Sequence, residues 1–333
     1  MGRIIIAGAV LAALVVLTLA GCPGQPGPAQ NGLVTSAAPA TPPATAQETL
    51  RVSGAFALYP MVVKWAEEYK KLHPGVNIDV SPGGAGKGAT DALGGLVQIG
   101  MISRAIKPEE EQKGGWWVPV CRDAVFPVVS EKNPVLEQLL AHGVKQEVLA
   151  GIWLTGKITT WGQVAGSNNA DKINVYTRSD ACGAAEVWSK YLGGQAQDDL
   201  HGIGQASDPG VAEAVRKDPR GIGYNNLNYA YDADTGKPVA GLRVVPIDLK
   251  GTGKLADSDK FYDTKEAVLK AVQDGRYPSP PARDLNFLCK GAPTGLTRDF
   301  IKWCLSDGQK YVLETGFIPL KAEKLGKAVG QVG

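Results

Sequence analysis

A strand, a turn and a helix follow one another twice in the first patterned part of the chain. Residues 49–53 read as a strand and 54–59 as a turn, after which Pro60 suits the first position of a helix with one apolar face. Residues 76–80 alternate as a second strand, followed by a glycine-rich turn at 83–88 and a helical stretch. This order predicts an α/β fold around a parallel sheet, with ligand chemistry at the carboxyl ends of the strands.

A further turn of this kind carries charge. Residues 173–176 read as a strand, and from Cys182 onward apolar residues fall at helical spacing. The first N–H groups of a helix have no intrahelical partner and attract an anion, and small residues let it come close. Arg178 adds a planar fork suited to a carboxylate or phosphate, and Asp180 either caps the helix or accepts a hydrogen bond from a protonated ligand oxygen. The turn is therefore a candidate anion site, with an ordinary capped helix and a surface arginine as the alternative.

The first 47 residues are expected to lie outside the fold. Residues 1–21 combine a basic start with a nearly unbroken apolar run and end in small residues before Cys22, which is the pattern of a bacterial lipoprotein signal peptide. Signal peptidase is expected to cut before Cys22, whose thiol is then lipidated. A single transmembrane anchor is the competing interpretation, but the apolar run is short for a span. Residues 22–47 are rich in proline and alanine and carry no charge, which predicts a flexible tether.

Composition narrows the class of protein. The remaining chain, 48–333, is long for a single domain, and its length is typical of two domains. The formal net charge is only +2, and no basic stripe interleaved with aromatic residues is present, so nucleic acid is not expected as a partner. No G-x-S-x-G or HExxH motif is present either. The sequence therefore predicts neither an enzyme nor a cofactor.

The cysteines and one acidic loop leave alternatives open. Cys121, Cys182, Cys289 and Cys304 show no CxxC spacing and lie far in sequence from the three histidines, so no zinc site is predicted. A bridge between Cys289 and Cys304 and free buried thiols are both compatible with the sequence. Residues 248–259 resemble a calcium loop only in part, because a lysine stands where an oxygen ligand is needed, so a plain turn is predicted there.

Several stretches, in order along the chain, together resemble the phosphate-binding proteins of bacterial phosphate ABC transporters. They are 54–60, 83–86, 99–104, 123–134, 152–161, 178–188, 221–224, 277–278, 308–310 and 316–320. An ordered series over nearly the whole of 48–320 is far more specific than any one member. The resemblance implies a two-lobed type II periplasmic binding protein fold with a ligand cleft between the lobes. The first lobe is expected to comprise 48–124 with 283–333, and the second 125–282.

The resemblance also implies which positions contact the anion. The implied contacts lie in four loops and are Leu58, Tyr59, Gly84, Ala85, Gly86, Ser103, Arg104, Arg178, Asp180, Cys182, Gly183 and Ala184. In the first loop a backbone N–H is expected to serve as donor, and in the last a helix N-terminus and the Arg178 guanidinium.

Four side-chain hydroxyls that this family places on the anion are absent. The positions concerned are Leu58, Ala85, Cys182 and Ala184. Each hydrogen bond to a charged group contributes about 1.5–3 kcal/mol, so the loss weakens phosphate binding unless other groups compensate. Candidates for compensation are Lys87, Arg104, Asn225 and Asn226. Two interpretations stay open: backbone N–H groups and two arginines still hold phosphate, or the ligand is another oxyanion, a phosphonate or a small carboxylate.

The expected function is therefore binding rather than catalysis. The resemblance implies an extracytoplasmic lipoprotein that binds a small oxyanion, phosphate foremost, and delivers it to the permease of an ABC transporter. A monomer is expected, held by its lipid at the periplasmic or extracellular face of a bacterial membrane. The first alternative is a ligand-sensing partner of a membrane signalling protein. An envelope phosphatase is a third, but it lacks a metal or nucleophile constellation.

Overall fold

The computed structural model describes residues 48–333, so the predicted signal segment, Cys22 and the tether lie outside the described residues. The strands of the described part are β1 Glu48–Gly54, β2 Val76–Pro82, β3 Ile99–Ile102, β4 Gly115–Ser130, β5 Asn174–Arg178, β6 Ile203–Gln205, β7 Gly221–Asn226, β8 Leu242–Val244 and β9 Ala282–Lys290. The α-helices are α1 Tyr59–Leu72, α2 Ala85–Leu93, α3 Pro108–Gln112, α4 Leu136–His142, α5 Gln146–Trp153, α6 Trp161–Ala165, α7 Gly183–Leu192, α8 Ser207–Lys217, α9 Leu227–Ala230, α10 Lys265–Asp274, α11 Gly295–Leu305, α12 Tyr311–Glu314 and α13 Ala322–Val332.

Local sequence explains where several helices begin and end. Pro60 lies in the first turn of α1, where its missing N–H costs nothing. Thr160 caps α6 by accepting the N–H of Gln163 in a capping box. Gly193 ends α7 in a left-handed conformation that glycine adopts without penalty.

Within residues 48–333 the nine strands form one continuous sheet. The order is β2-β1-β3-β9-β4-β7-β5-β6, with β8 beside β4. β1 pairs in parallel with β2 and β3, which confirms the parallel pairing predicted from the first two strand–turn–helix units. The sheet as a whole is mixed, because β4 and β9 pair antiparallel with their neighbours. β5 pairs in parallel with β6 and β7, so the charged turn after β5 also follows the end of a parallel strand.

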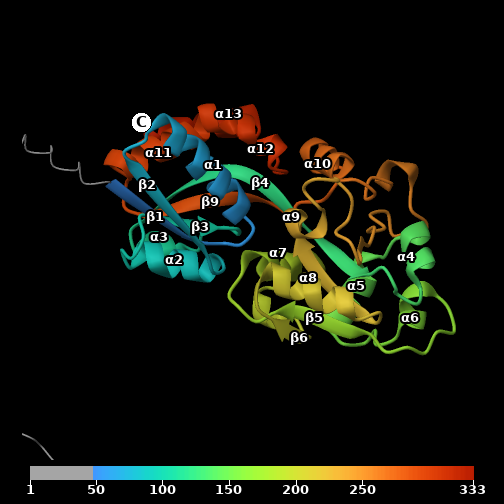
Figure 1. The fold of residues 1–333 in the computed structure, drawn as a ribbon. Coiled ribbons are helices and arrows are strands. Elements are labelled where there is room, and N and C mark those ends of the chain that lie inside the picture. Colours follow the sequence, from blue (N-terminus) through green and yellow to red (C-terminus); the bar gives the residue numbers. More distant parts are fainter. Residues whose placement is uncertain (1–47) are drawn as a thin grey trace, which may run out of the picture. The chain divides into compact units, whose positions relative to one another are not determined.

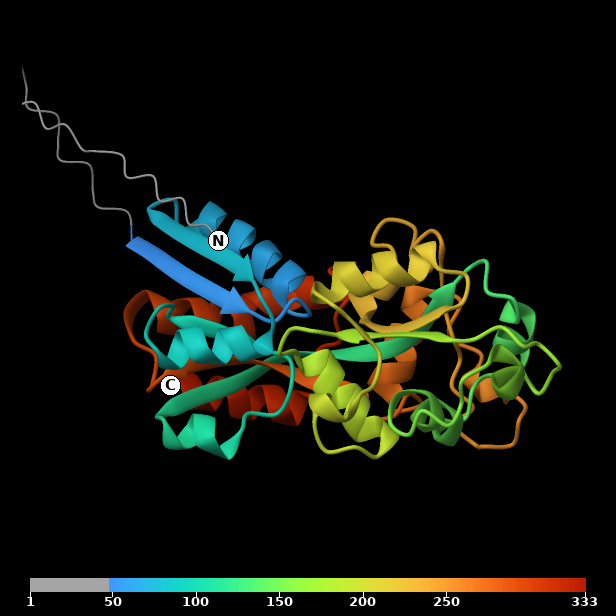
Figure 2. The same ribbon diagram turned by 90° about the horizontal axis from the view of Figure 1, so that it is seen from below.

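The long strand β4 belongs to both halves of the sheet, as Figure 1 shows. Its first part pairs antiparallel with β9, and its last part pairs with β7 and β8. In the half that contains β1, helices α1, α11 and α13 lie on one face and α2 on the other (Figures 1 and 2). β4 and β9 are therefore the strands along which the chain passes between the two halves.

Two separate buried clusters form the core of this part of the chain. One draws its residues from between Leu50 and Cys121 and from between Leu285 and Val332. The other draws its residues from between Ala124 and Ala282, joined by Ile318. Because each half of the sheet has its own apolar core, the described chain consists of two lobes.

Three glycines allow α2 to lie directly on the sheet. A Cβ on Gly54, whose φ is +133°, would lie 2.8 Å from the Cα of Gly88. A Cβ on Gly88 would lie 2.7 Å from the carbonyl oxygen of Met101, and one on Gly100 would lie too close to the backbone of Gly88. Backbone meets backbone here, so the position of α2 and of the glycine-rich loop before it is fixed by the absence of side chains.

Several open questions from the sequence are answered for residues 48–333. All four cysteines in this part are buried free thiols, so the Cys289–Cys304 bridge is absent. In loop 248–259 Asp248 accepts the N–H of Gly253 at 2.6 Å, which closes a turn, and the loop ends in a short 3₁₀ helix at Asp257–Asp259. No helix between residues 48 and 333 combines the length and the apolar character needed to cross a bilayer.

The close packing of α2 predicts an unusual response to alanine. In an ordinary helix interior Gly→Ala stabilises by about 1 kcal/mol. Gly88→Ala is expected instead to lower the free energy of unfolding by about 1–3 kcal/mol, because its Cβ overlaps Met101 and Gly54. Gly326→Ala in α13 is the control, since nothing lies within 4 Å of its Cβ position. Urea unfolding of both variants measures the contrast, and equal effects of the two substitutions would contradict it.

Candidate functional site

Arg178 lies at the carboxyl end of β5 with its side chain almost completely buried. Its own N–H donates to the hydroxyl oxygen of Tyr224 at 3.2 Å, and that hydroxyl also hydrogen-bonds Thr177 at 2.8 Å. Tyr224 in turn packs among Trp153 and Trp188 of the second core. The backbone at Arg178 is therefore held by the core beneath it, which fixes the point from which the guanidinium projects.

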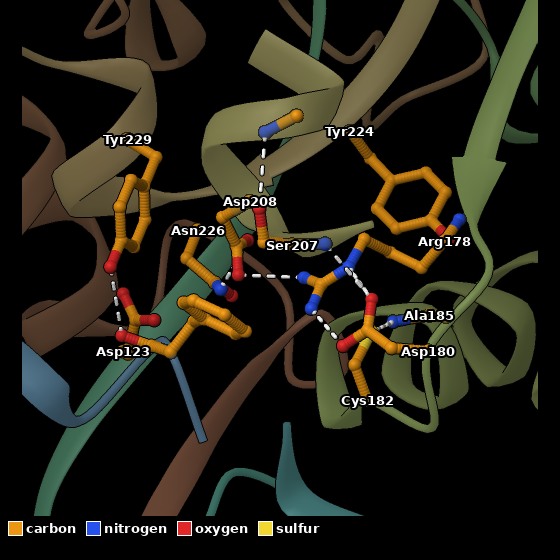
Figure 3. Close-up of polar contacts among 12 residues, drawn as sticks. Asp123, Arg178, Asp180, Cys182, Ala185, Ser207, Asp208, Tyr224, Asn226 and Tyr229 are labelled. Carbon is orange, nitrogen blue, oxygen red and sulfur yellow. Dashed lines mark hydrogen bonds and ion pairs between the residues drawn. The ribbon is translucent and has the colours of Figure 1, made fainter. Parts of the chain in front are cut away.

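Two carboxylates hold the guanidinium of Arg178, as Figure 3 shows. Nε and Nη2 donate to the two oxygens of Asp180 at 2.8 and 2.5 Å, and Nη1 donates to Oδ2 of Asp208 at 2.6 Å. Burial alone would lower the pKa of Arg178, but the negative charges of Asp208 and Asp180 raise it above its usual value. Burial likewise opposes ionisation of Asp180, yet the hydrogen bond from Arg178 holds its pKa below the ordinary range. Arg178 and Asp180 are therefore both ionised at neutral pH.

The second carboxylate, Asp208, belongs to the first turn of α8. The preceding residue, Ser207, has a left-handed backbone with φ of 67°, a conformation that costs an ordinary residue about 1–2 kcal/mol. In this conformation its N–H donates to Oδ1 of Asp180 at 3.0 Å. Backbone strain at this point thus goes together with the contacts that tie the start of α8 to Arg178 and Asp180.

Helix α7 begins beside this charged cluster. Cys182 is the N-cap, and its sulfur accepts the N–H of Ala185 at 3.3 Å. Burial raises the pKa of the Cys182 thiol to about 12, so it remains protonated at neutral pH. Gln197 secures the turn by accepting the N–H of Cys182 and donating to the carbonyl of Asp180. The turn places the free N–H groups of a helix start next to Arg178, which is the geometry of an anion site.

The turn before α7 meets two loops of the other lobe. The N–H of Gly86 donates to the carbonyl of Ala181 at 3.0 Å, and a Cβ on Gly84 would lie 2.9 Å from Asp180. Gly183 lies so close to Ser103 that a Cβ would come within 2.2 Å of the Ser103 carbonyl oxygen. The second, third and fourth predicted loops thus converge, with Ala85, Gly86, Ser103, Cys182, Gly183 and Ala184 among the residues brought together.

The first predicted loop, 54–59, faces the charged cluster through Phe56 and not through Leu58 or Tyr59. Leu58 is fully buried in the first core, and the N–H groups of Leu58 and Tyr59 both donate to the carbonyl of Ala55. The residue that faces the charged cluster is Phe56, whose ring centre lies 5.5 Å from Cζ of Arg178 in a cation–π contact. Its carbonyl accepts the hydroxyl of Tyr229 at 3.1 Å.

Arg104 and Lys87 are already engaged by acidic side chains. Arg104 forms a two-pronged ion pair with Glu110 at 2.6 and 2.9 Å, and its Nε lies 3.4 Å from Glu186 in the first turn of α7. Lys87 pairs with Asp91 on its own helix. Arg104 therefore links the two lobes by an ion pair, and both cations already have acidic partners within the described residues.

Sequence reasoning missed Asp208, Asn226 as its partner, and Phe56. Asn226 donates to Oδ1 of Asp208 at 2.6 Å, and it was named only as a substitute donor for the anion. The signal for Asp208 was present, because Ser207-Asp208-Pro209 before an apolar helical run is typical of a helix start. Nothing in the sequence indicated that this helix start lies beside Arg178, since 30 residues separate the two.

A second charged pair lies deeper, where β4 and β9 pair. Asp123 and Arg283 are directly opposite each other in the register, both are buried, and their nearest oxygen and nitrogen are 3.5 Å apart. Burial raises the pKa of Asp123 to about 6, although the positive charge of Arg283 partly opposes the shift. Asp123 therefore loses its proton in the folded protein only as the pH approaches neutrality.

This carboxyl group predicts a pH dependence of stability. A carboxyl whose folded pKa exceeds its unfolded pKa stabilises the fold below the unfolded value and loses that contribution as the pH rises through the folded value. The pKa of Asp123 is about 6 in the folded protein, against an ordinary value of 3.8. The stability of the wild type relative to that of Asp123→Asn, measured as the difference in their free energies of unfolding, should therefore fall by on the order of 3 kcal/mol between pH 4 and pH 7.

Denaturant unfolding at several pH values measures this difference. Asp91→Asn is the contrasting variant, because the hydrogen bonds from Lys87 and Ser53 hold the pKa of Asp91 below its ordinary value against the effect of burial. Its difference from the wild type should grow as the pH rises from 3 to 5. If the difference between the wild type and Asp123→Asn does not change with pH, the pKa of the Asp123 carboxyl is not raised in the folded protein.

Comparison with known proteins places most of the described part of the chain in one family. A family model described as the PBP superfamily domain matches residues 39–308. The phosphate-binding protein PstS of Xylella fastidiosa (strain Temecula1) is 27% identical over 339 residues, which cover 91% of each chain. PstS of Bacillus subtilis (strain 168) is 26% identical over 282 residues, covering 84% of this chain and 83% of the relative.

Solved structures agree with these matches. A phosphate ABC transporter substrate-binding protein from Clostridium perfringens, solved with bound phosphate, has a TM-score of 0.67 and 25% identity, covering 82% of this chain and all of that one. An ABC-type phosphate transport receptor from Vibrio cholerae shares the fold, with a TM-score of 0.60 at 20% identity. The resemblance inferred from the sequence and the type II binding-protein fold are therefore confirmed. The chain belongs to the PBP superfamily.

Proposed function

We propose that this protein binds a small oxyanion, with phosphate foremost, between its two lobes and delivers it to the permease of an ABC transporter. The observation that carries the proposal is the buried Arg178 beside the start of α7, where two loops of the other lobe close over the same turn. A guanidinium and the N–H groups of a helix start are the donors that a compact oxyanion requires. The relatives named as phosphate-binding proteins over most of their length support the same ligand.

The charge balance of the site bears on which oxyanion fits. One arginine faces two carboxylates, Asp180 and Asp208, so these three groups together carry a net negative charge. An anion that keeps a proton can donate it to a carboxylate oxygen, whereas fully ionised sulfate has only acceptors to offer. The proposed selectivity is therefore for hydrogenphosphate over sulfate, with Asp180, the more exposed of the two carboxylates, as acceptor.

The remaining parts of the proposal rest on the sequence. Lipidation at Cys22 would hold the protein at the outer face of a bacterial membrane, where a monomer would present its ligand to the permease. The protein is proposed to bind and release its ligand without chemical change, so no catalytic residue is assigned.

Titration of the intrinsic fluorescence tests the proposed ligand. Trp153 and Trp188 lie in the core beneath Arg178, so ligand binding should change the emission of the purified protein. Saturable binding of phosphate, with sulfate at least roughly ten-fold weaker, is the expected result, because one lost charge-assisted hydrogen bond corresponds to about 1.5–3 kcal/mol.

Variants make this titration specific to the site. Arg178→Gln should weaken phosphate binding by roughly 10- to 100-fold for the same reason. The exposed Arg220 provides the control Arg220→Gln, which should leave the affinity unchanged. If the folded wild type shows no saturable response to phosphate but binds a phosphonate or a carboxylate, phosphate is the wrong ligand.

The close approach of Gly183 to Ser103 predicts a variant that folds but does not close. Gly183 begins α7 and its backbone suits alanine, so Gly183→Ala should keep the melting temperature of the wild type. Its Cβ would overlap the backbone of Ser103 in the other lobe, so the lobes should be unable to approach as closely. Phosphate affinity should fall by at least roughly ten-fold, since a closed site is needed to surround the ligand.

Small-angle scattering and the same titration measure this effect together. With saturating phosphate, Gly183→Ala should keep a larger radius of gyration than the wild type. Gly210→Ala in α8 is the matched control, because the nearest atom to its Cβ position, Oγ of Ser207, lies at an ordinary 3.6 Å. Wild-type affinity in Gly183→Ala would show that the approach of Gly183 to Ser103 is not part of the bound state.

A further inference from the structure

We propose that Asp123 and Arg283, on the two strands that link the lobes, are positioning residues of the anion site, and that they orient Arg178 through Asn226 and Asp208. This inference rests on the proposed function for its ligand, but part of its test needs no ligand. Neither residue contacts the guanidinium of Arg178 directly, and neither follows from the resemblance by which the site was first recognised.

The first observation is that two ion pairs lie side by side on the same two strands. β4 and β9 place Asp123 opposite Arg283 and, one step along, Arg122 opposite Asp284. Successive residues of a strand point to opposite faces, so the two pairs face opposite sides of the ribbon. Arg122 and Asp284 are partly exposed, whereas Asp123 and Arg283 are buried with 1% and 6% of their side chains accessible.

The second observation is that the buried pair is poorly satisfied. Among residues 48–333, neither carboxylate oxygen of Asp123 meets a donor at hydrogen-bond geometry, and Nε and Nη1 of Arg283 meet no acceptor. A buried ion pair offsets its loss of hydration only when its remaining donors and acceptors are also bonded. The pair therefore contributes little to stability by itself, and an apolar pair of the same volume would serve the core better.

The third observation is that the one side-chain hydrogen bond that Arg283 makes within the described residues connects it, through Asn226 and Asp208, to Arg178. Its Nη2 donates to Oδ1 of Asn226, whose Nδ2 donates to Oδ1 of Asp208 at 2.6 Å. Oδ2 of Asp208 then accepts Nη1 of Arg178 at 2.6 Å (Figure 3). The amide of Asn226 has one acceptor and one donor end, so this sequence of contacts has a fixed direction from cation to carboxylate.

The consequence is that the strands linking the lobes help to set the orientation of Arg178. Asn226 ends β7 and pairs with Val125 of β4, two residues from Asp123, so the path runs over packed strands to Asp208 at the start of α8. Any change in how β4 and β9 lie against β7 shifts Asn226 relative to Arg283 and thus alters the carboxylate that holds Arg178. The path is a physical connection between the strand pair and the anion site, and it can be broken at one residue, Asn226.

The experiment breaks the path at two places and compares it with the neighbouring pair. Asn226→Ala removes the connecting amide, and the double variant Asp123→Asn/Arg283→Gln removes both buried charges together, so that no lone charge is left in the core. Arg122→Gln is the matched control on the opposite face of the same strands. Each is titrated with phosphate, and the Nε–H resonance of Arg178 is followed in protein labelled with ¹⁵N-arginine, with and without phosphate.

Both path variants are expected to weaken phosphate affinity by roughly three- to thirty-fold, the range typical of residues that act on a site through others. They should also shift or broaden the Nε–H signal of Arg178 in the absence of phosphate, while Arg122→Gln changes neither quantity. A merely structural pair would lower the melting temperature without moving the Arg178 signal.

The outcomes separate this inference from the proposed function. If the wild type does not bind phosphate but the path variants still shift the Arg178 signal, the ligand is wrong and the positioning role stands. If the path variants fold and the Arg178 signal is that of the wild type, the positioning role is overturned, whatever the affinity for phosphate.

Discussion

The need of the buried Arg178 guanidinium for carboxylate partners organises the functional part of this molecule. Arg178 lies in a core environment where an unpaired charge would cost several kcal/mol, so its carboxylate partners must be brought to it. Asp180 comes from the same turn, and Asp208 comes from the start of another helix. The left-handed backbone of Ser207 goes together with this pairing. Its N–H donates to Asp180, and the next residue in the chain, Asp208, pairs with Arg178.

Small residues determine how closely the two lobes approach each other. Glycines and alanines stand at the points where loops 83–86 and 180–184 approach each other and Ser103, so backbone can meet backbone. At Gly54, Gly88 and Gly100 a similar approach brings α2 onto the sheet. Small residues therefore have two uses here: they set the position of a helix start within a lobe, and they let the two lobes approach each other closely.

The absence of four hydroxyls has a structural counterpart. Leu58 packs in the first core, and the sulfur of Cys182 caps α7. Each of these two side chains therefore has a structural role of its own at a position where the family has a hydroxyl. The described structure also has a dense set of charges near these positions, in which Arg104 links Glu110 to Glu186 and Arg178 links Asp180 to Asp208. The described residues around Arg178 thus include more charged groups than neutral side-chain donors.

Local patterns in the sequence predicted the parts of this protein that depend on neighbours in the chain. The strand–turn–helix units, the parallel pairing that follows from them and the helix start after Arg178 all arise from short-range periodicity and helix-end chemistry, so they were visible in the residues. The ordered resemblance added the two-lobed fold. The lobe boundaries and the set of ligand contacts remain predictions, although the separate cores meet near Ala124 and Ala282.

Contacts between distant segments could not be predicted in this way. The partners of Arg178 at Asp208, of Arg104 at Glu186 and of Asp123 at Arg283 are separated by between 30 and 160 residues in the chain. No pattern of nearby residues encodes which carboxylate reaches which cation, because every buried cation has the same need for a negative partner. The sequence by itself determined the elements and the chemistry of the turn that ends β5. The tertiary structure alone decided the pairing of charges, since only the packing of β4, β7 and β9 sets which side chains share a buried space.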